Sequence, residues 1–119
     1  MRDSGFDVIL EDLLESDVVY AGWSAGACVA GGRMEAVAIM DEPDATAPGY
    51  VTNGPLKTGL GLLPYTIIPH HESDHPDASA AGKAVGWARD HGVEYVALRD
   101  GEVIVENQGR IEILPKLYL

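Results

Sequence analysis

Residues 18–31 read VVYAGWSAGACVAG and join an apolar run to a run of small residues through a single serine. The β-branched start of residues 18–23 predicts a short buried strand. The small residues of 24–31 predict a helix that packs closely on a sheet and ends at Gly31. A strand that turns directly into a helix is the building unit of α/β proteins, so this stretch indicates the fold class.

The remaining segments predict further helices and strands, followed by a hairpin. Helices are expected over residues 5–16 and 77–92, and Gly92 is expected to end the second one. The Pro- and Gly-rich stretch 41–61 is expected to be a loop. The segments expected to be extended are 34–40, 65–70, 93–101 and 102–114, the last with a hairpin turn around residues 107–109. The sequence therefore predicts one domain, residues 1–119, with an α/β fold in which helices flank a mostly parallel sheet.

Composition and charge exclude several classes of function. The chain has 119 residues, with 19 acidic and 8 basic side chains and a formal net charge of −11. Nucleic acids and anionic membrane surfaces need a basic surface, so neither is an expected partner. No apolar run approaches the roughly 20 residues of a membrane span, and the N-terminus lacks a signal-peptide pattern. A single cysteine, Cys28, cannot form an internal disulfide, and a cytoplasmic location is expected.

The pattern G-x-S-x-G occupies residues 22–26. In a nucleophile elbow, a serine at this place lies on a strained turn between a strand and a helix. A Cβ on Gly22 or Gly26 is expected to collide with that strand or helix. Ser24 would then stand at the edge of the sheet, and the Ala25 N–H would face a developing oxyanion. The pattern alone leaves two interpretations open, a nucleophile at Ser24 or a small residue in a tight turn.

A histidine-rich segment, IIPHHESDHPD at residues 67–77, follows a predicted strand. His70, at the end of that strand, is placed to act as a base for Ser24. A metal site is the second interpretation, and a polar solvated loop is the third. Possible metal ligands are His70, His71, Glu72, Asp74 and His75. A helix would bring His71 and His75 onto one face, but Pro69 and Pro76 argue against that helix.

A carboxylate is needed to orient such a base. Asp100 ends a predicted strand and precedes a turn, whereas Asp41, Glu42 and Asp44 lie in the loop after residues 34–40. In so acidic a chain no single aspartate stands out, so these candidates stay open.

Three stretches together resemble the peptidase E (aspartyl dipeptidase) and cyanophycinase family of serine peptidases. YAGWSAGA (20–27) is similar to its nucleophile elbow, and GLGLLPYTIIPHHESDHPD (59–77) is similar to its histidine segment. YVALRDGEVIVENQG (95–109) is similar to its late segment, in which a strand runs into an acidic residue followed by glycine. The agreement extends from about residue 8 to the end. The resemblance implies the C-terminal half of a class I glutamine amidotransferase-like (flavodoxin-like) fold.

By this resemblance Ser24 is the nucleophile and His70 is the general base and acid. Asp100 or Asp41 supplies the third member, and only one of them is expected to contact His70. The resemblance implies an oxyanion donor at Ala25 and substrate contacts by Trp23 and His71. It implies hydrolysis of dipeptides or short peptides, with an N-terminal aspartyl residue, and no cofactor or metal.

The sequence also departs from the family pattern. Family members are near twice as long, and the arginine that aspartyl-specific members carry after the histidine segment has no match here. A chain of this length is expected to leave an apolar face uncovered, so an obligate homo-oligomer, a dimer or tetramer, is expected. Two alternatives remain open, a catalytically inactive oligomerisation or binding module and a metal-binding protein that uses His70, His71 and His75.

Overall fold

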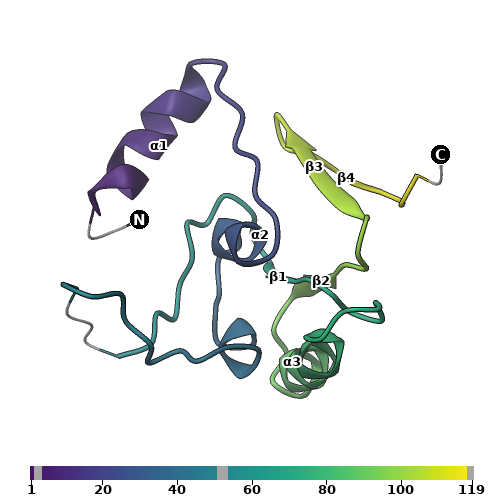
Figure 1. Ribbon diagram of the computed structural model, residues 1–119. Helices are drawn as coiled ribbons and strands as arrows, with labels where there is room; N and C mark the ends of the chain where they lie inside the picture. Colours follow the sequence, from purple (N-terminus) through teal and green to yellow (C-terminus); the bar gives the residue numbers. More distant parts are fainter. Residues whose placement is uncertain (2–3, 51–53, 118–119) are drawn as a thin grey trace.

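The protein is described by a computed structural model that covers residues 1, 4–50 and 54–117. It forms a small mixed α/β arrangement, shown in Figure 1. The elements in chain order are α1 (Phe6–Glu15), α2 (Ala25–Ala30), the 3₁₀ helix η2 (Val37–Ile39), β1 (Thr66–Ile68), α3 (Ala78–Asp90), β2 (Tyr95–Ala97), β3 (Val103–Asn107) and β4 (Arg110–Leu114).

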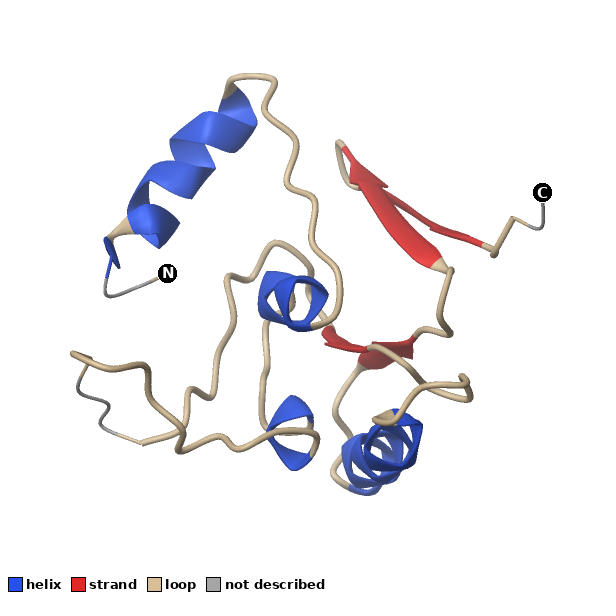
Figure 2. Ribbon diagram, viewed as in Figure 1, coloured by secondary structure: helices blue, strands red, loops and turns tan. Residues whose placement is uncertain are grey.

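The centre of the fold is the parallel pair of β1 and β2, in which Ile67 lies opposite Val96. Successive side chains of a strand point to opposite faces, and β1 uses both of its faces. Ile67 packs with Ala30 of α2, whereas Ile68 packs with Ala36, directly before η2, and with residues of α3. Figure 2 accordingly shows α2 on one side of the strand pair and α3 on the other. This three-layer arrangement is the part of the expected α/β fold that is confirmed.

Helix α3 confirms the helix predicted over residues 77–92. Its buried residues are Ala81, Ala84 and Ala88, spaced by three and four positions, so they form one face. Because these side chains are small, the helix can lie close to the fully buried Ile68. Gly92 follows with a φ of 62°, the left-handed conformation that commonly ends a helix.

The predicted hairpin is also confirmed. β3 and β4 pair antiparallel from Val103 opposite Leu114 to Asn107 opposite Arg110. The two residues between the strands, Gln108 and Gly109, both have positive φ, as a two-residue type I′ turn requires. Ile104 packs against the cluster around Ile67, which fixes the hairpin to the fold beside β2.

Two predicted strands are wrong. Residues 18–23 run extended without a partner strand among the described residues, and Val19 is 84% exposed. A strand needs the N–H and C=O groups of a neighbour, and apolar composition does not supply one. Residues 34–40 instead turn and contain η2, because their N–H groups find partners nearby: the Ala38 N–H donates to the Met34 carbonyl and the Met40 N–H to the Val37 carbonyl. The parallel sheet is therefore narrower than predicted.

The N-terminal helix is confirmed as α1, although it is largely exposed. Leu10 is its only buried residue within Phe6–Glu15. The described parts of 41–61 form a loop, as predicted, apart from one isolated bridge between Arg33 and Thr58; residues 51–53 lie outside the described residues. In the described part of the chain, none of the helices has both the length and the apolar character that crossing a membrane requires.

Candidate active site

Ser24 occupies a sharp turn between the extended residues 18–23 and α2. Its φ of 48° and ψ of −121° are rare for a residue with a side chain and are the kind of strain that a nucleophile elbow stores. Its carbonyl oxygen accepts hydrogen bonds from the N–H groups of Ala27 and Cys28, each 3.0 Å long. The Tyr20 hydroxyl donates to the Gly26 carbonyl over 2.6 Å, which ties the incoming segment to α2.

The two glycines of the motif are not equivalent. A Cβ added to Gly22 would lie 2.5 Å from the Gly26 carbonyl oxygen and 3.1 Å from the Ala27 nitrogen, so the expected collision is confirmed there. A Cβ added to Gly26 would meet no described atom within 4 Å, so the expected collision at that position is wrong. The close approach of the incoming segment to α2 thus depends on Gly22 alone.

His70 and Asp100 meet because each lies shortly after one of two neighbouring parallel strands, two residues after β1 and three residues after β2. The ladder continues beyond β1 and β2: Leu98 N–H donates to the Ile68 carbonyl, and His71 N–H donates to the Leu98 carbonyl, both over 2.9 Å. Carboxyl ends of parallel strands share one edge of a sheet, where α/β sites form. His70 and Asp100 therefore project at the same edge.

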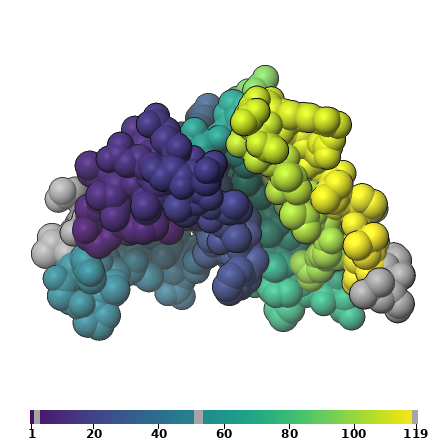
Figure 3. Space-filling view, turned by 90° about the horizontal axis from the view of Figure 1, so that it is seen from above, coloured from purple at the N-terminus to yellow at the C-terminus, as the bar shows by residue number. Residues whose placement is uncertain are grey.

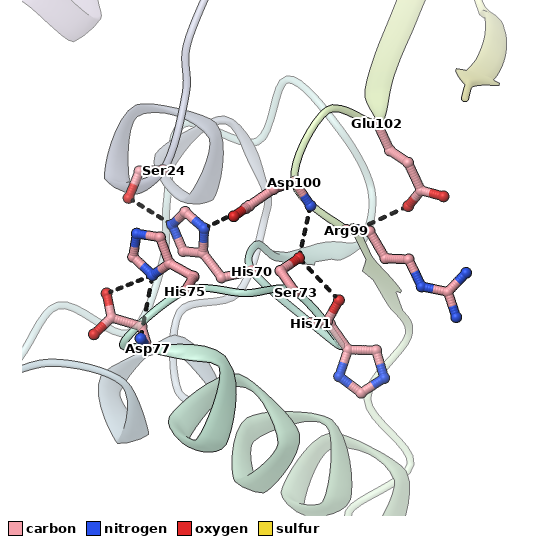
Figure 4. Close-up of polar contacts among 9 residues, drawn as sticks. All are labelled: Ser24, His70, His71, Ser73, His75, Asp77, Arg99, Asp100 and Glu102. Carbon is pink, nitrogen blue, oxygen red and sulfur yellow. Dashed lines mark hydrogen bonds and ion pairs between the residues drawn. The ribbon is translucent and has the colours of Figure 1, made fainter. Parts of the chain in front are cut away.

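Figure 4 shows the His70 ring lying between Ser24 and Asp100. Its Nδ1 is 2.7 Å from Asp100 Oδ1, and its Nε2 is 3.2 Å from Ser24 Oγ. An ionised carboxylate can only accept, so Nδ1 carries the proton in the neutral ring and Nε2 is left to accept from the serine hydroxyl. The geometry is that of a nucleophile, a base and an orienting acid.

Strained backbone conformations are concentrated at this site. Five described residues other than glycine have a positive φ, and three of them are Ser24, His70 and Glu72. Such conformations cost free energy and persist only where the surroundings hold them. At His70 the strained backbone follows the buried Pro69 directly and turns the ring toward Ser24.

A second set of contacts, which no sequence pattern indicated, holds Asp100 and the histidine segment together. Asp100 N–H donates to Ser73 Oγ over 2.7 Å, and the Ser73 hydroxyl donates to the His71 carbonyl over 3.3 Å. Arg99 pairs with Glu72, and this pairing lowers the pKa of Glu72 and raises that of Arg99. The contacts span the turn after β1 and the end of β2.

The other predicted site residues are placed as follows. The Asp41 carboxylate accepts the Glu42 N–H over 2.8 Å, and its described contacts do not include His70. The His71 ring points away from Ser24 in Figure 4, and its Nε2 is 3.9 Å from Glu72 Oε1. Trp23 is 85% exposed. The Ala25 N–H has no hydrogen-bond partner in the described part of the chain.

The structure also brings donor atoms of His70, His75 and Asp77 within 4.8 Å of one another, rather than those of His71. The rings of His70 and His75 are stacked and nearly parallel, 3.7 Å between centroids. Nitrogen lone pairs lie in the ring planes, so those of parallel stacked rings do not converge on one ion. Both His70 nitrogens and His75 Nδ1 already have partners. This arrangement does not form a metal centre without turning a ring.

An open apolar groove of about 560 Å³ begins beside the elbow. Most of its lining residues come from α1 and from the extended segment, among them Phe6, Leu13, Val18 and Trp23. In Figure 3, α1 (purple) and the β3–β4 hairpin (yellow) lie on opposite sides of one face of the molecule. The groove therefore offers apolar surface directly next to Ser24.

Comparison with known proteins bears on this geometry. The profile of peptidase family S51 matches residues 1–114. The chain belongs to peptidase family S51. The predicted resemblance to peptidase E is thereby confirmed.

A solved structure similar to this S51 chain is that of a protein from Listeria monocytogenes EGD-e, assigned as a peptidase E. The TM-score is 0.75 at 18% identity, which shows a shared fold. The alignment covers 96% of this chain and 51% of the Listeria chain, so the S51 chain spans about half the length of that protein. The comparison with curated proteins gave no significant match.

Proposed function

We propose that the chain is a serine peptidase that hydrolyses dipeptides or short peptides through Ser24, His70 and Asp100. The observation that carries the proposal is the unbroken line of contacts from Ser24 Oγ through the His70 ring to Asp100, with Ser24 in an elbow conformation. Membership of peptidase family S51 supports the same chemistry.

In the proposed reaction, His70 Nε2 takes the proton of the Ser24 hydroxyl as Oγ attacks the scissile carbonyl carbon. Asp100 accepts from Nδ1–H and stabilises the imidazolium that forms. The Ala25 N–H, which has no other partner among the described residues, donates to the oxyanion. His70 then returns the proton to the leaving amine, the C–N bond breaks, and water hydrolyses the acyl-enzyme by the same sequence of transfers.

The proposed substrate carries an N-terminal aspartyl residue, by analogy with the aspartyl dipeptidases that Trp23 and the elbow resemble. Trp23 is exposed next to Ser24 and is proposed to contact the substrate, whereas the orientation of His71 offers no support for such a contact. A comparison of Asp-X, Glu-X, Ala-X and Lys-X dipeptides tests this preference. A preference for Lys-X would contradict it, and the net charge of −11 makes that the informative competitor.

Hydrolysis of Asp-X dipeptides, measured with Ser24→Ala and His70→Ala variants, tests the proposed chemistry. Each variant should lose activity by several orders of magnitude. Ser79→Ala and His91→Ala are matched controls, because both residues are exposed and lie on or after α3, away from the contacts of Ser24. Activity that survives Ser24→Ala would refute the assignment. Absence of a fluorophosphonate adduct at Ser24 would favour the alternative, an inactive binding or oligomerisation module.

The chain is further proposed to act as a homo-oligomer, a dimer or tetramer. Support comes from large apolar side chains that lie exposed in two parts of the molecule. They are Val8, Ile9, Val18, Val19 and Trp23 on the N-terminal side, and Val103, Val105, Ile111, Ile113 and Leu114 on the hairpin. Large exposed apolar side chains in such number are typical of interfaces.

A further inference from the structure

The face of the His70 ring is covered by a second imidazole. The rings of His70 and His75 are 3.7 Å apart between centroids, and their planes differ by 7°. We propose that His75 is a positioning residue of this site: its neutral ring holds the His70 ring in line with Ser24 and Asp100 and stabilises the charge that His70 gains during the reaction. The inference rests on the proposed function.

The proton on His75 can be placed from its hydrogen bond. His75 Nδ1 lies 3.1 Å from the backbone nitrogen of Asp77, which donates to it. A nitrogen that accepts has no proton, so the neutral ring carries its proton on Nε2. Asp77 directly precedes α3, and its side chain makes no capping bond to that helix. His75 is therefore fixed between the start of α3 on one side and the His70 ring on the other.

The stack has a direct consequence for orientation. A ring that bonds through both nitrogens can still tilt about the line between them. His70 has such a line, from Ser24 through the ring to Asp100, and Figure 4 shows His75 lying against this ring. A parallel neighbour at van der Waals distance opposes the tilt, so it keeps Nε2 aimed at the serine hydroxyl.

The stacked His75 ring also affects the stability of the charge on His70. When His70 takes the Ser24 proton it becomes a cation lying over the face of a neutral aromatic ring, an attractive arrangement. Protonation of His75 would reverse this, because it would oppose two positive charges 3.7 Å apart and break the bond from Asp77 N–H. The charged groups facing His75 are the Asp77 carboxylate, 3.7 Å from Nδ1, and beyond His70 the Asp100 carboxylate.

The competing explanation is that His75 serves only to receive the Asp77 N–H and so helps to start α3. Two substitutions separate these roles. His75→Asn keeps a side-chain acceptor but removes the ring, whereas His75→Phe keeps a ring but removes the acceptor. His91→Ala is the matched control, because His91 is also a histidine stacked on an aromatic ring, 4.1 Å from Trp87, at the far end of α3.

The experiment measures kcat and KM for an Asp-X dipeptide with the intact chain and these variants, after thermal unfolding has checked that each one folds. We expect His75→Asn and His75→Ala to lower kcat about 2- to 30-fold with little change in KM, and His75→Phe to recover most of the loss. His91→Ala should match the unsubstituted protein. A His75→Phe variant that is no better than His75→Ala, or an unchanged kcat in His75→Asn, would overturn the proposal.

The signals of the His70 ring protons give a further readout. The NMR shifts of the His70 ring protons should move when His75 becomes Ala and much less when it becomes Phe. This measurement needs no activity, so it tests the stack even if the proposed hydrolysis fails. Unchanged His70 shifts in His75→Ala would overturn the inference by themselves.

Discussion

Gly22→Ala is expected to disable the proposed nucleophile, Ser24, while leaving most of the fold intact. The new Cβ would lie 2.5 Å from the Gly26 carbonyl oxygen and 2.6 Å from the Gly26 carbonyl carbon, whereas ordinary contacts begin at 3.4 Å. Both atoms belong to the backbone of α2, so the incoming segment must move away by about 0.9 Å. Ser24 follows two residues later, and its Oγ is already 3.2 Å from His70 Nε2.

A displacement of that size would lengthen this hydrogen bond beyond an effective distance. Misplacement of about 1 Å at a reacting atom can cost about 10²-fold in rate. We therefore expect kcat/KM for an Asp-X dipeptide to fall about 100-fold, and fluorophosphonate labelling of Ser24 to slow by a similar factor. Thermal unfolding, followed by circular dichroism, should report only a moderate loss of stability.

Gly26→Ala is the matched control, since it changes the other glycine of the same motif. A Cβ there meets no described atom within 4 Å, and alanine is favoured over glycine inside a helix by about 1 kcal/mol. This variant should keep its labelling rate and be slightly more stable. If Gly22→Ala labels as fast as the unsubstituted protein, or if Gly26→Ala loses as much as Gly22→Ala, the argument from close approach is wrong.

Three further predictions concern the acid, the thiol and the assembly. Asp100→Asn should lower kcat by about 10⁴-fold, while Asp41→Asn should stay within about twofold; equal losses in steady-state assays would contradict the assignment of Asp100. Burial raises the pKa of the Cys28 thiol from its usual 9 to about 11. As the pH rises, the unfolded chain therefore loses the thiol proton before the folded chain does. The free energy of unfolding should then fall by up to about 3 kcal/mol between pH 9 and pH 11. Urea titrations should show less of this fall in Cys28→Ala, and an identical fall would count against the thiol as its source. Sedimentation at micromolar concentration should give a dimer or tetramer, and a monomer would refute the proposed oligomer.

Local patterns predicted the helices and the hairpin well. The alanine face of α3, the terminating Gly92 and the Gln108-Gly109 turn each act within a few residues, so the sequence carries the information directly. The two failed strands, 18–23 and 34–40, depend on partners elsewhere in the chain. Apolar composition indicated that these segments could be extended, but it could not supply a neighbouring strand.

The dependence on partner strands also explains why the sequence could not decide which aspartate is the proposed partner of His70. Asp41 and Asp100 each follow an apolar segment that was expected to be extended, so the local pattern did not distinguish them. The segment before Asp41 contains η2, and the fully buried Ala36 directly before η2 packs with α3. Of the two segments, β2 is the one that pairs with β1 and brings its aspartate beside His70. Parallel pairing with β1 is thus the physical difference between the two aspartates.

The positions of Ser73 and His75 could not be predicted for a different reason. Both lie in the turn after β1, where His70 and Glu72 have left-handed backbone conformations that no sequence rule assigns to these residues. These conformations decide which side chains face Ser24. They place His75 on the His70 ring, and they direct the His71 ring elsewhere.

The elbow itself shows how a strained turn can be specified locally. Residues 18–23 have no partner strand in the described chain, yet Ser24 keeps its unusual conformation. The interactions that hold it all lie within residues 20–28: the Tyr20 hydroxyl on the Gly26 carbonyl, the narrow approach at Gly22, and the two N–H groups that bond to the Ser24 carbonyl. The turn therefore depends on α2 rather than on a sheet, and α2 in turn is anchored on β1 through Ala30 and Ile67. By this reasoning Tyr20→Phe, which removes only the hydroxyl, should loosen the elbow and slow labelling of Ser24, whereas substitutions of the exposed Val19 should not.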